Sequence, residues 1–118
     1  MIRVMLVDDT GEVRRMLKER LGFELDIEVI GEADNGQHAL ELAARLQPDV
    51  IIMDVKMPQT DGIAATQALN ELLPGSRVVI LSLYDDPVTR QRAREAGARA
   101  FIAKQDSETD LLEAIRSM

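Results

Sequence analysis

The sequence predicts a doubly wound α/β fold, in which helices cover both faces of a parallel β-sheet. Five short apolar runs alternate with five amphipathic stretches, which is typical of repeated strand and helix units around a parallel sheet. Most of the runs are continuously apolar, which indicates strands that are buried on both faces. The 118 residues are enough for one packed core and too few for two ordinary ones. We therefore expect a single domain over 1–118.

The apolar runs are the expected strands. Glu28, Gly31 and Glu32 interrupt the second run, so we expect it at an edge of the sheet, where polar residues are tolerated. The expected strands are Ile2–Val7, Ile27–Ala33, Val50–Met53, Arg77–Leu81 and Ala100–Ala103.

Apolar residues at helical spacing follow each strand and predict one buried stripe per helix. The four clearest stripes are Val13, Met16, Leu17 and Leu21; Ala39, Leu40, Ala43 and Leu46; Ile63, Leu69, Leu72 and Leu73; and Leu111, Leu112, Ile115 and Met118. The fourth of the five helices is mostly polar and can bury little beyond Val88, Ala93 and Ala96. That helix is therefore either marginally packed or a surface for a partner.

Prolines and capping residues predict where the helices begin and end. Pro48 and Pro74-Gly75 stop the second and third helices, because proline cannot continue a helix. Asp86-Pro87 offers an N-cap followed by proline at the first helical position. Ser107, with Asp110 three residues on, is the expected cap of the last helix.

Composition excludes several classes of protein. The net charge of −7 argues against direct contact with nucleic acid, because that affinity comes largely from Lys and Arg. No apolar run approaches the roughly 18 residues that a membrane span needs, and the start of the chain lacks a signal-peptide core. We therefore expect no membrane contact and a cytoplasmic location. The absence of cysteine removes disulfides and thiolate metal sites.

Polar side chains follow four of the five expected strands. Asp8-Asp9 ends the first strand, Asp54 the third, Ser82 the fourth and Lys104 the fifth. In an open parallel sheet, ligands bind outside the carboxyl ends of the strands. A single strand-terminal Asp is usually a turn residue, but four such strand ends together indicate a site.

Crowded carboxylates repel one another unless a cation neutralises them, and oxygen ligands favour a hard ion such as Mg²⁺. Magnesium leaves room for phosphate oxygens in its coordination shell. A carboxylate such as Asp54 can attack phosphorus while Lys104 neutralises charge on the phosphoryl oxygens. Ser82 could bond a phosphoryl oxygen once one arrives, which predicts a switch.

Several motifs in order along the whole chain resemble the receiver domain of response regulators in two-component systems. They are Asp8-Asp9, Asp54 followed by Val55-Lys56-Met57-Pro58 and Asp61-Gly62, Ser82, and the run from Gly97 to Lys104. The resemblance implies a flavodoxin-like (βα)5 fold with a sheet of order 2-1-3-4-5, for which the doubly wound receiver fold is a standard example. It does not imply an enzyme, since receivers catalyse only their own phosphorylation and dephosphorylation.

The resemblance also implies roles for single residues. Asp54 accepts phosphate from a phosphohistidine on a sensor histidine kinase or histidine phosphotransfer protein. Asp9, Asp54 and the backbone carbonyl of Lys56 bind Mg²⁺, Asp8 contributes through water, and Lys104 contacts the phosphoryl group.

A switch surface is implied as well. By this likeness Ser82 moves toward phosphate and the aromatic Phe101 turns inward, which changes the surface of the fourth helix, fifth strand and fifth helix. Homodimerisation or control of an output domain follows from that change. The Asn35-Gly36 start of the second helix and the ending from Leu111 to Arg116 are similar to those of receivers attached to a C-terminal helix-turn-helix DNA-binding domain, which would lie outside this chain.

Some residues depart from the common receiver pattern and leave alternative functions open. Leu83 stands where a small residue is frequent, Gln105 where proline is frequent, and Lys56 places a positive charge beside the acceptor. A pseudo-receiver that binds partners without phosphorylation is one alternative, favoured by Leu83. A phosphatase of the haloacid-dehalogenase type is another, but it needs a further acidic pair after a later strand. We interpret His38, the one histidine, as a solvated surface residue.

Overall fold

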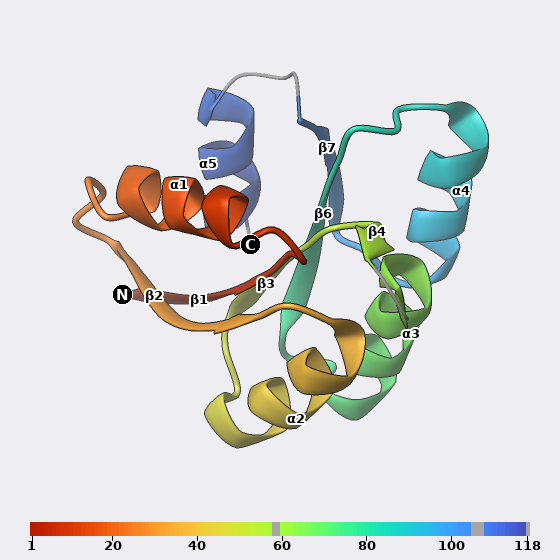
Figure 1. Ribbon diagram of the computed structural model, residues 1–118, viewed down its shortest axis with the longest axis horizontal. Coiled ribbons are helices and arrows are strands. Elements are labelled where there is room, and N and C mark those ends of the chain that lie inside the picture. The colour runs from red at the N-terminus through yellow and green to blue at the C-terminus, as the bar shows by residue number, and fades with distance from the viewer. Residues whose placement is uncertain (58–59, 105–107, 118) are drawn as a thin grey trace.

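A five-stranded parallel sheet forms the centre of the molecule (Figure 1). The computed structural model describes residues 1–57, 60–104 and 108–117. The strands are β1 (Ile2–Val7), β2 (Ile27–Ala33), β3 (Val50–Met53), β6 (Arg77–Ser82) and β7 (Ala100–Ala103). They pair in the order β2-β1-β3-β6-β7. Counted along the chain this is 2-1-3-4-5, so the predicted flavodoxin-like topology and the edge position of the second strand are confirmed.

A small antiparallel ribbon, which the sequence did not predict, follows β3. It consists of β4 (Lys56–Met57) and β5 (Thr60–Asp61), with Lys56 paired to Asp61. The ribbon connects the end of β3 to the helix that comes next in the chain. Lys56, in the first strand of this ribbon, comes two residues after Asp54, which directly follows β3.

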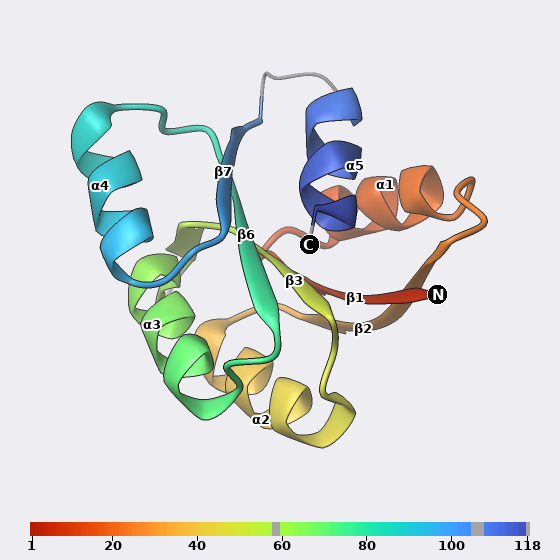
Figure 2. The same ribbon diagram turned by 180° about the vertical axis from the view of Figure 1, so that it is seen from behind.

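Five helices cover the two faces of the sheet (Figures 1 and 2). One face carries α1 (Gly11–Leu21) and α5 (Glu108–Arg116), and the other carries α2 (Gly36–Leu46), α3 (Gly62–Leu72) and α4 (Pro87–Glu95). Each face has its own apolar core, because strand residues point alternately to opposite sides. No helix in the described ranges is long and apolar enough to cross a bilayer.

Three apolar residues that were expected to be buried on helices are exposed. Met16, Leu72 and Val88 have exposed fractions of 45%, 63% and 67%. On α1 and α3 the row that faces the sheet holds Leu17 and Leu69, which are buried. Met16 immediately precedes Leu17, which puts it about 100° around the helix, since a turn holds about 3.6 residues. The stripes on α1 and α3 were therefore predicted one residue too wide.

The fourth helix is packed through small residues. Ala93 and Ala96 are buried as expected, whereas Val88 is exposed, so this helix buries even less apolar surface than the sequence predicts. The predicted N-cap is confirmed too: the Asp86 side chain accepts a hydrogen bond from the Thr89 amide at 3.0 Å. The predicted cap Ser107, as well as Gln105 and Met118, lies outside the described residues.

Gly62 begins α3 at a point where two backbone segments nearly touch. A β-carbon at this position would lie 2.0 Å from the Asp54 carbonyl oxygen and 2.8 Å from the Val55 Cα. The Gly62 amide donates to the Val55 carbonyl at 2.8 Å. Only glycine allows this approach, and the approach holds the chain around Asp54 in place.

We predict that Gly62→Ala lowers the free energy of unfolding by about 2 kcal/mol or more, because the clash is with backbone that cannot rotate away. Gly75→Ala is the matched control, since a β-carbon there meets no atom within 4 Å, and its effect should stay within about 0.5 kcal/mol. Urea denaturation of both variants measures the difference. Equal stabilities would show that the backbone at Asp54 relaxes freely.

Candidate functional site

Four strand ends meet at the carboxyl edge of the sheet, as predicted. Asp8 and Asp9 directly follow β1, Asp54 follows β3, Lys104 follows β7, and Ser82 is the last residue of β6. One carboxylate oxygen from each of the three aspartates lies within 4.8 Å of the other two. The structure therefore gathers a compact acidic cluster from two neighbouring strands.

Lys104 places a positive charge between two of these carboxylates. Its Nζ lies 3.4 Å from Asp8 Oδ2 and 3.6 Å from Asp54 Oδ1. The side chains of Asp8 and Asp54 are only 5% and 10% exposed. Their charges are therefore poorly screened by solvent, and the ammonium group offsets their mutual repulsion.

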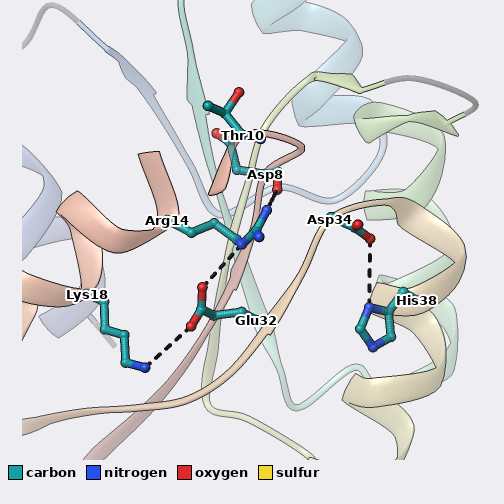
Figure 3. A network of polar contacts seen from close by, with 7 residues as sticks. All are labelled: Asp8, Thr10, Arg14, Lys18, Glu32, Asp34 and His38. Carbon is teal, nitrogen blue, oxygen red and sulfur yellow. Dashed lines mark hydrogen bonds and ion pairs between the residues drawn. The ribbon is translucent and has the colours of Figure 1, made fainter. Parts of the chain in front are cut away.

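Backbone and side-chain contacts hold Asp8 firmly. Its amide donates to the Ala33 carbonyl on β2 at 3.1 Å, and its Oδ1 accepts from the Thr10 amide at 2.9 Å. Its carbonyl oxygen accepts from Arg14 Nη1 at 2.5 Å, as Figure 3 shows. Every polar group of Asp8 thus has a partner, which fixes the turn that leads into Asp9.

Ser82 lies beside Lys104 along paired strands. The Lys104 amide donates to the Ser82 carbonyl at 2.7 Å. Ser82 is fully buried, and its Oγ accepts from the Tyr84 amide at 2.9 Å. This bond uses a lone pair of the hydroxyl and leaves its proton available for donation. Leu83, which follows, is 67% exposed and so points largely into solvent.

Phe101 lies half-buried on β7 under a guanidinium group. The Arg90 Cζ atom stands 4.7 Å from the centre of the Phe101 ring, a distance suited to a cation–π interaction. Arg90 also pairs with Asp85 in the loop before α4. Its hydrogen bond lowers the pKa of the Asp85 carboxyl. Arg90 therefore links the loop after Ser82 to Phe101.

The donor set of the cluster fits a hard divalent cation. It offers carboxylate oxygens, and within the described chain no cysteine or histidine joins it. Oxygen donors of this kind suit Mg²⁺. Lys56 belongs to β4 close in sequence to Asp54, and its backbone carbonyl is the further oxygen predicted from the sequence.

Two arginines near the site were missed in the sequence. Arg14 bonds the Asp8 carbonyl, and Arg90 covers Phe101. No local pattern in the sequence distinguishes these two arginines, because their partners come from other elements. His38 is half-exposed and lies 3.9 Å from an Asp34 oxygen on the surface, away from Asp8 (Figure 3).

Comparison with known proteins assigns the family. The family model described as "Response regulator receiver domain" matches residues 4–116. The response regulator protein VraR of Staphylococcus saprophyticus is 39% identical over 98% of this chain and 55% of its own length. The transcriptional regulatory protein LiaR of Bacillus subtilis is 39% identical over 99% of this chain and 56% of its own.

The comparison with solved structures also finds response regulators. A two-component response regulator of the LuxR family from Aurantimonas sp. SI85-9A1 superposes with a TM-score of 0.93 at 29% identity, covering 98% of this chain and 82% of that chain. This chain spans about half the length of the curated relatives named above. Its similarity to regulators of transcription, predicted from the sequence, is confirmed. The chain belongs to the response regulator receiver domain family.

Proposed function

We propose that this domain is a phosphorylatable switch, in which Asp54 accepts a phosphoryl group in the presence of Mg²⁺. The observation that carries the proposal is the position of Lys104, with its Nζ within 3.6 Å of both Asp8 and Asp54. Asp9 completes an acidic cluster within 4.8 Å. A nucleophilic carboxylate, a cation beside it and further oxygen ligands are the components that phosphoryl transfer requires.

The reaction is a displacement at phosphorus. An Asp54 carboxylate oxygen forms a bond to phosphorus, and the bond from phosphorus to the phosphohistidine nitrogen breaks, with the electron pair returning to the imidazole. Lys104 neutralises negative charge on the transferred phosphoryl oxygens. The donor is a sensor histidine kinase or a histidine phosphotransfer protein.

Magnesium fits the same group of residues. Asp9, Asp54 and the Lys56 backbone carbonyl would hold the ion, with Asp8 reaching it through water. Bound there, Mg²⁺ supplies positive charge that offsets repulsion between the carboxylates and the incoming phosphate. The hydrogen bonds on Asp8 keep this edge of the site in place before the ion arrives.

The signal leaves the site through Ser82. Once Asp54 is phosphorylated, the Ser82 hydroxyl donates to a phosphoryl oxygen, and Phe101 and Arg90 rearrange with the loop between them. The surface formed by α4, β7 and α5 then changes, which controls homodimerisation or an output domain in the cytoplasm. Because the curated relatives are about twice as long and LiaR is a transcriptional regulator, the output we propose is a C-terminal DNA-binding domain.

Incubation with Mg²⁺ and acetyl phosphate tests the phosphorylation. Intact mass should show one added phosphoryl group on the wild type, and none on Asp54→Asn, because the amide lacks the nucleophilic oxygen. Asp34→Asn is the matched control, since Asp34 is an exposed aspartate outside the cluster, and it should be modified like the wild type. Chelation of Mg²⁺ should lower the initial rate by about 100-fold or more.

An unmodified wild type, with donor and metal shown to be active, would contradict the proposal and favour the pseudo-receiver. Modification of Asp54→Asn would contradict the choice of acceptor.

The single tyrosine reports on the switch, because Tyr84 bonds Ser82 and the chain has no tryptophan. We predict that phosphorylation changes Tyr84 fluorescence in the wild type. Intact mass should show that Ser82→Ala still gains the phosphoryl group. Most of the fluorescence change should be lost, because alanine has no hydroxyl that could donate to a phosphoryl oxygen. Ser76→Ala is the control: its hydroxyl bonds the Pro48 carbonyl instead. A full fluorescence change in Ser82→Ala would refute the coupling.

A further inference from the structure

Arg14 on α1 is joined to the acidic cluster and to the edge strand at once. Its Nη1 donates to the Asp8 carbonyl at 2.5 Å, and its Nε donates to Glu32 Oε1 at 3.2 Å. The Arg14 side chain is 20% exposed and that of Glu32 is 33% exposed. Figure 3 shows the guanidinium between Asp8 and Glu32.

We propose that Arg14 is a positioning residue for Mg²⁺ binding, which acts by fixing the peptide group between Asp8 and Asp9. This inference rests on the proposed function in one respect only, that the cluster binds Mg²⁺. Arg14 does not contact the ion. It determines how the two carboxylates are presented to it.

The peptide group carries this effect because Asp9 is exposed. The Asp8 carboxylate is held by the Thr10 amide, but the direction of the Asp9 side chain depends on the backbone that leads to it. The carbonyl of that peptide group is the atom that Arg14 bonds. Rotation of the peptide would move the Asp9 carboxylate away from the other two.

Glu32 holds the guanidinium in the required orientation. It lies on β2, in register with Leu6 of β1, so its position is set by the sheet. Arginine can donate to both partners through its planar fork, whereas the single ammonium of lysine cannot match that geometry. The chain from Glu32 through Arg14 to Asp8 therefore ties the metal-binding turn to the sheet.

Lys18 provides a matched comparison. It lies one turn further along α1 and pairs with the other Glu32 oxygen at 3.4 Å. It bonds Glu32 on the side away from Asp8, as Figure 3 shows. Arg14→Ala and Lys18→Ala thus remove the same charge from the same network, and only the first removes a bond to the site.

The sign of the effect separates positioning from simple charge. Loss of a nearby positive charge should by itself strengthen the binding of a cation, because like charges repel. Loss of a residue that orients the ligands should weaken binding by about 10-fold to 100-fold, as for other outer-shell partners of metal ligands. The two explanations therefore predict opposite results for Arg14→Ala.

Isothermal titration of the full chain with MgCl₂ tests the inference. We expect Arg14→Ala to bind Mg²⁺ about 10-fold more weakly than the wild type, and Lys18→Ala to stay within about 2-fold of it. Arg14→Lys keeps the charge and should still bind more weakly than the wild type. The acetyl phosphate reaction of Arg14→Ala should recover toward the wild-type rate at saturating Mg²⁺.

Equal or tighter Mg²⁺ binding by Arg14→Ala would overturn the inference, as would an equal loss in Lys18→Ala. Thermal unfolding shows whether each variant is folded. If Arg14→Ala unfolds at the assay temperature, the Mg²⁺ affinity of Arg14→Lys is compared with that of the wild type instead. A wild type that binds Mg²⁺ without being phosphorylated would refute the proposed phosphoryl acceptor and leave the Arg14 comparison valid. A wild type that binds no Mg²⁺ would refute both.

Discussion

Repulsion between carboxylates is the constraint around which the rest of the site is organised. Asp8 and Asp54 are nearly buried and end neighbouring strands, and one lysine from a distant strand lies between them. Without a cation the charges would cost free energy, because burial removes the water that screens them. Lys104 offsets that cost in the folded protein and leaves the third carboxylate, Asp9, facing solvent.

The surrounding structure keeps this arrangement rigid at the level of the backbone. Gly62 allows α3 to begin against the Asp54 carbonyl, and the amide of Asp54 itself bonds the Val7 carbonyl of β1 at 2.9 Å. On the other side, Arg14 and Thr10 hold the turn at Asp8. The site is thus built at strand ends and tight turns whose backbone is held by hydrogen bonds.

The helix α4 is, by contrast, held through few apolar contacts, since Ala93 is its only buried residue. Arg90 covers Phe101, and Arg92 pairs with Asp61 at 3.1 Å, which joins α4 to the N-cap of α3. Exposed polar pairs of this kind contribute little to stability. A helix anchored by alanines and such pairs can change position at low cost, which suits a surface that responds to the site.

Local sequence patterns determined the strands, the strand-end residues and the Asp86 cap, because each depends on neighbours a few positions away. Only the tertiary structure decided which stripe residues face the sheet, leaving Met16 and Leu72 outside. It also decided that Gly31, an interruption in the sequence, makes room for the Leu42 and Leu46 side chains.

In the functional site, too, some features follow from the sequence and others depend on the tertiary structure. The sequence by itself identified Asp8, Asp9, Asp54, Ser82 and Lys104 as residues at the carboxyl ends of strands, since parallel strands bring such ends to one edge. Lys104 meets Asp8 across 96 positions, and Arg14 meets Glu32 across 18. The contact between Lys104 and Asp8 follows from the order of the strands. The contact between Arg14 and Glu32 depends on how α1 packs beside the edge strand, so only the tertiary structure reveals it.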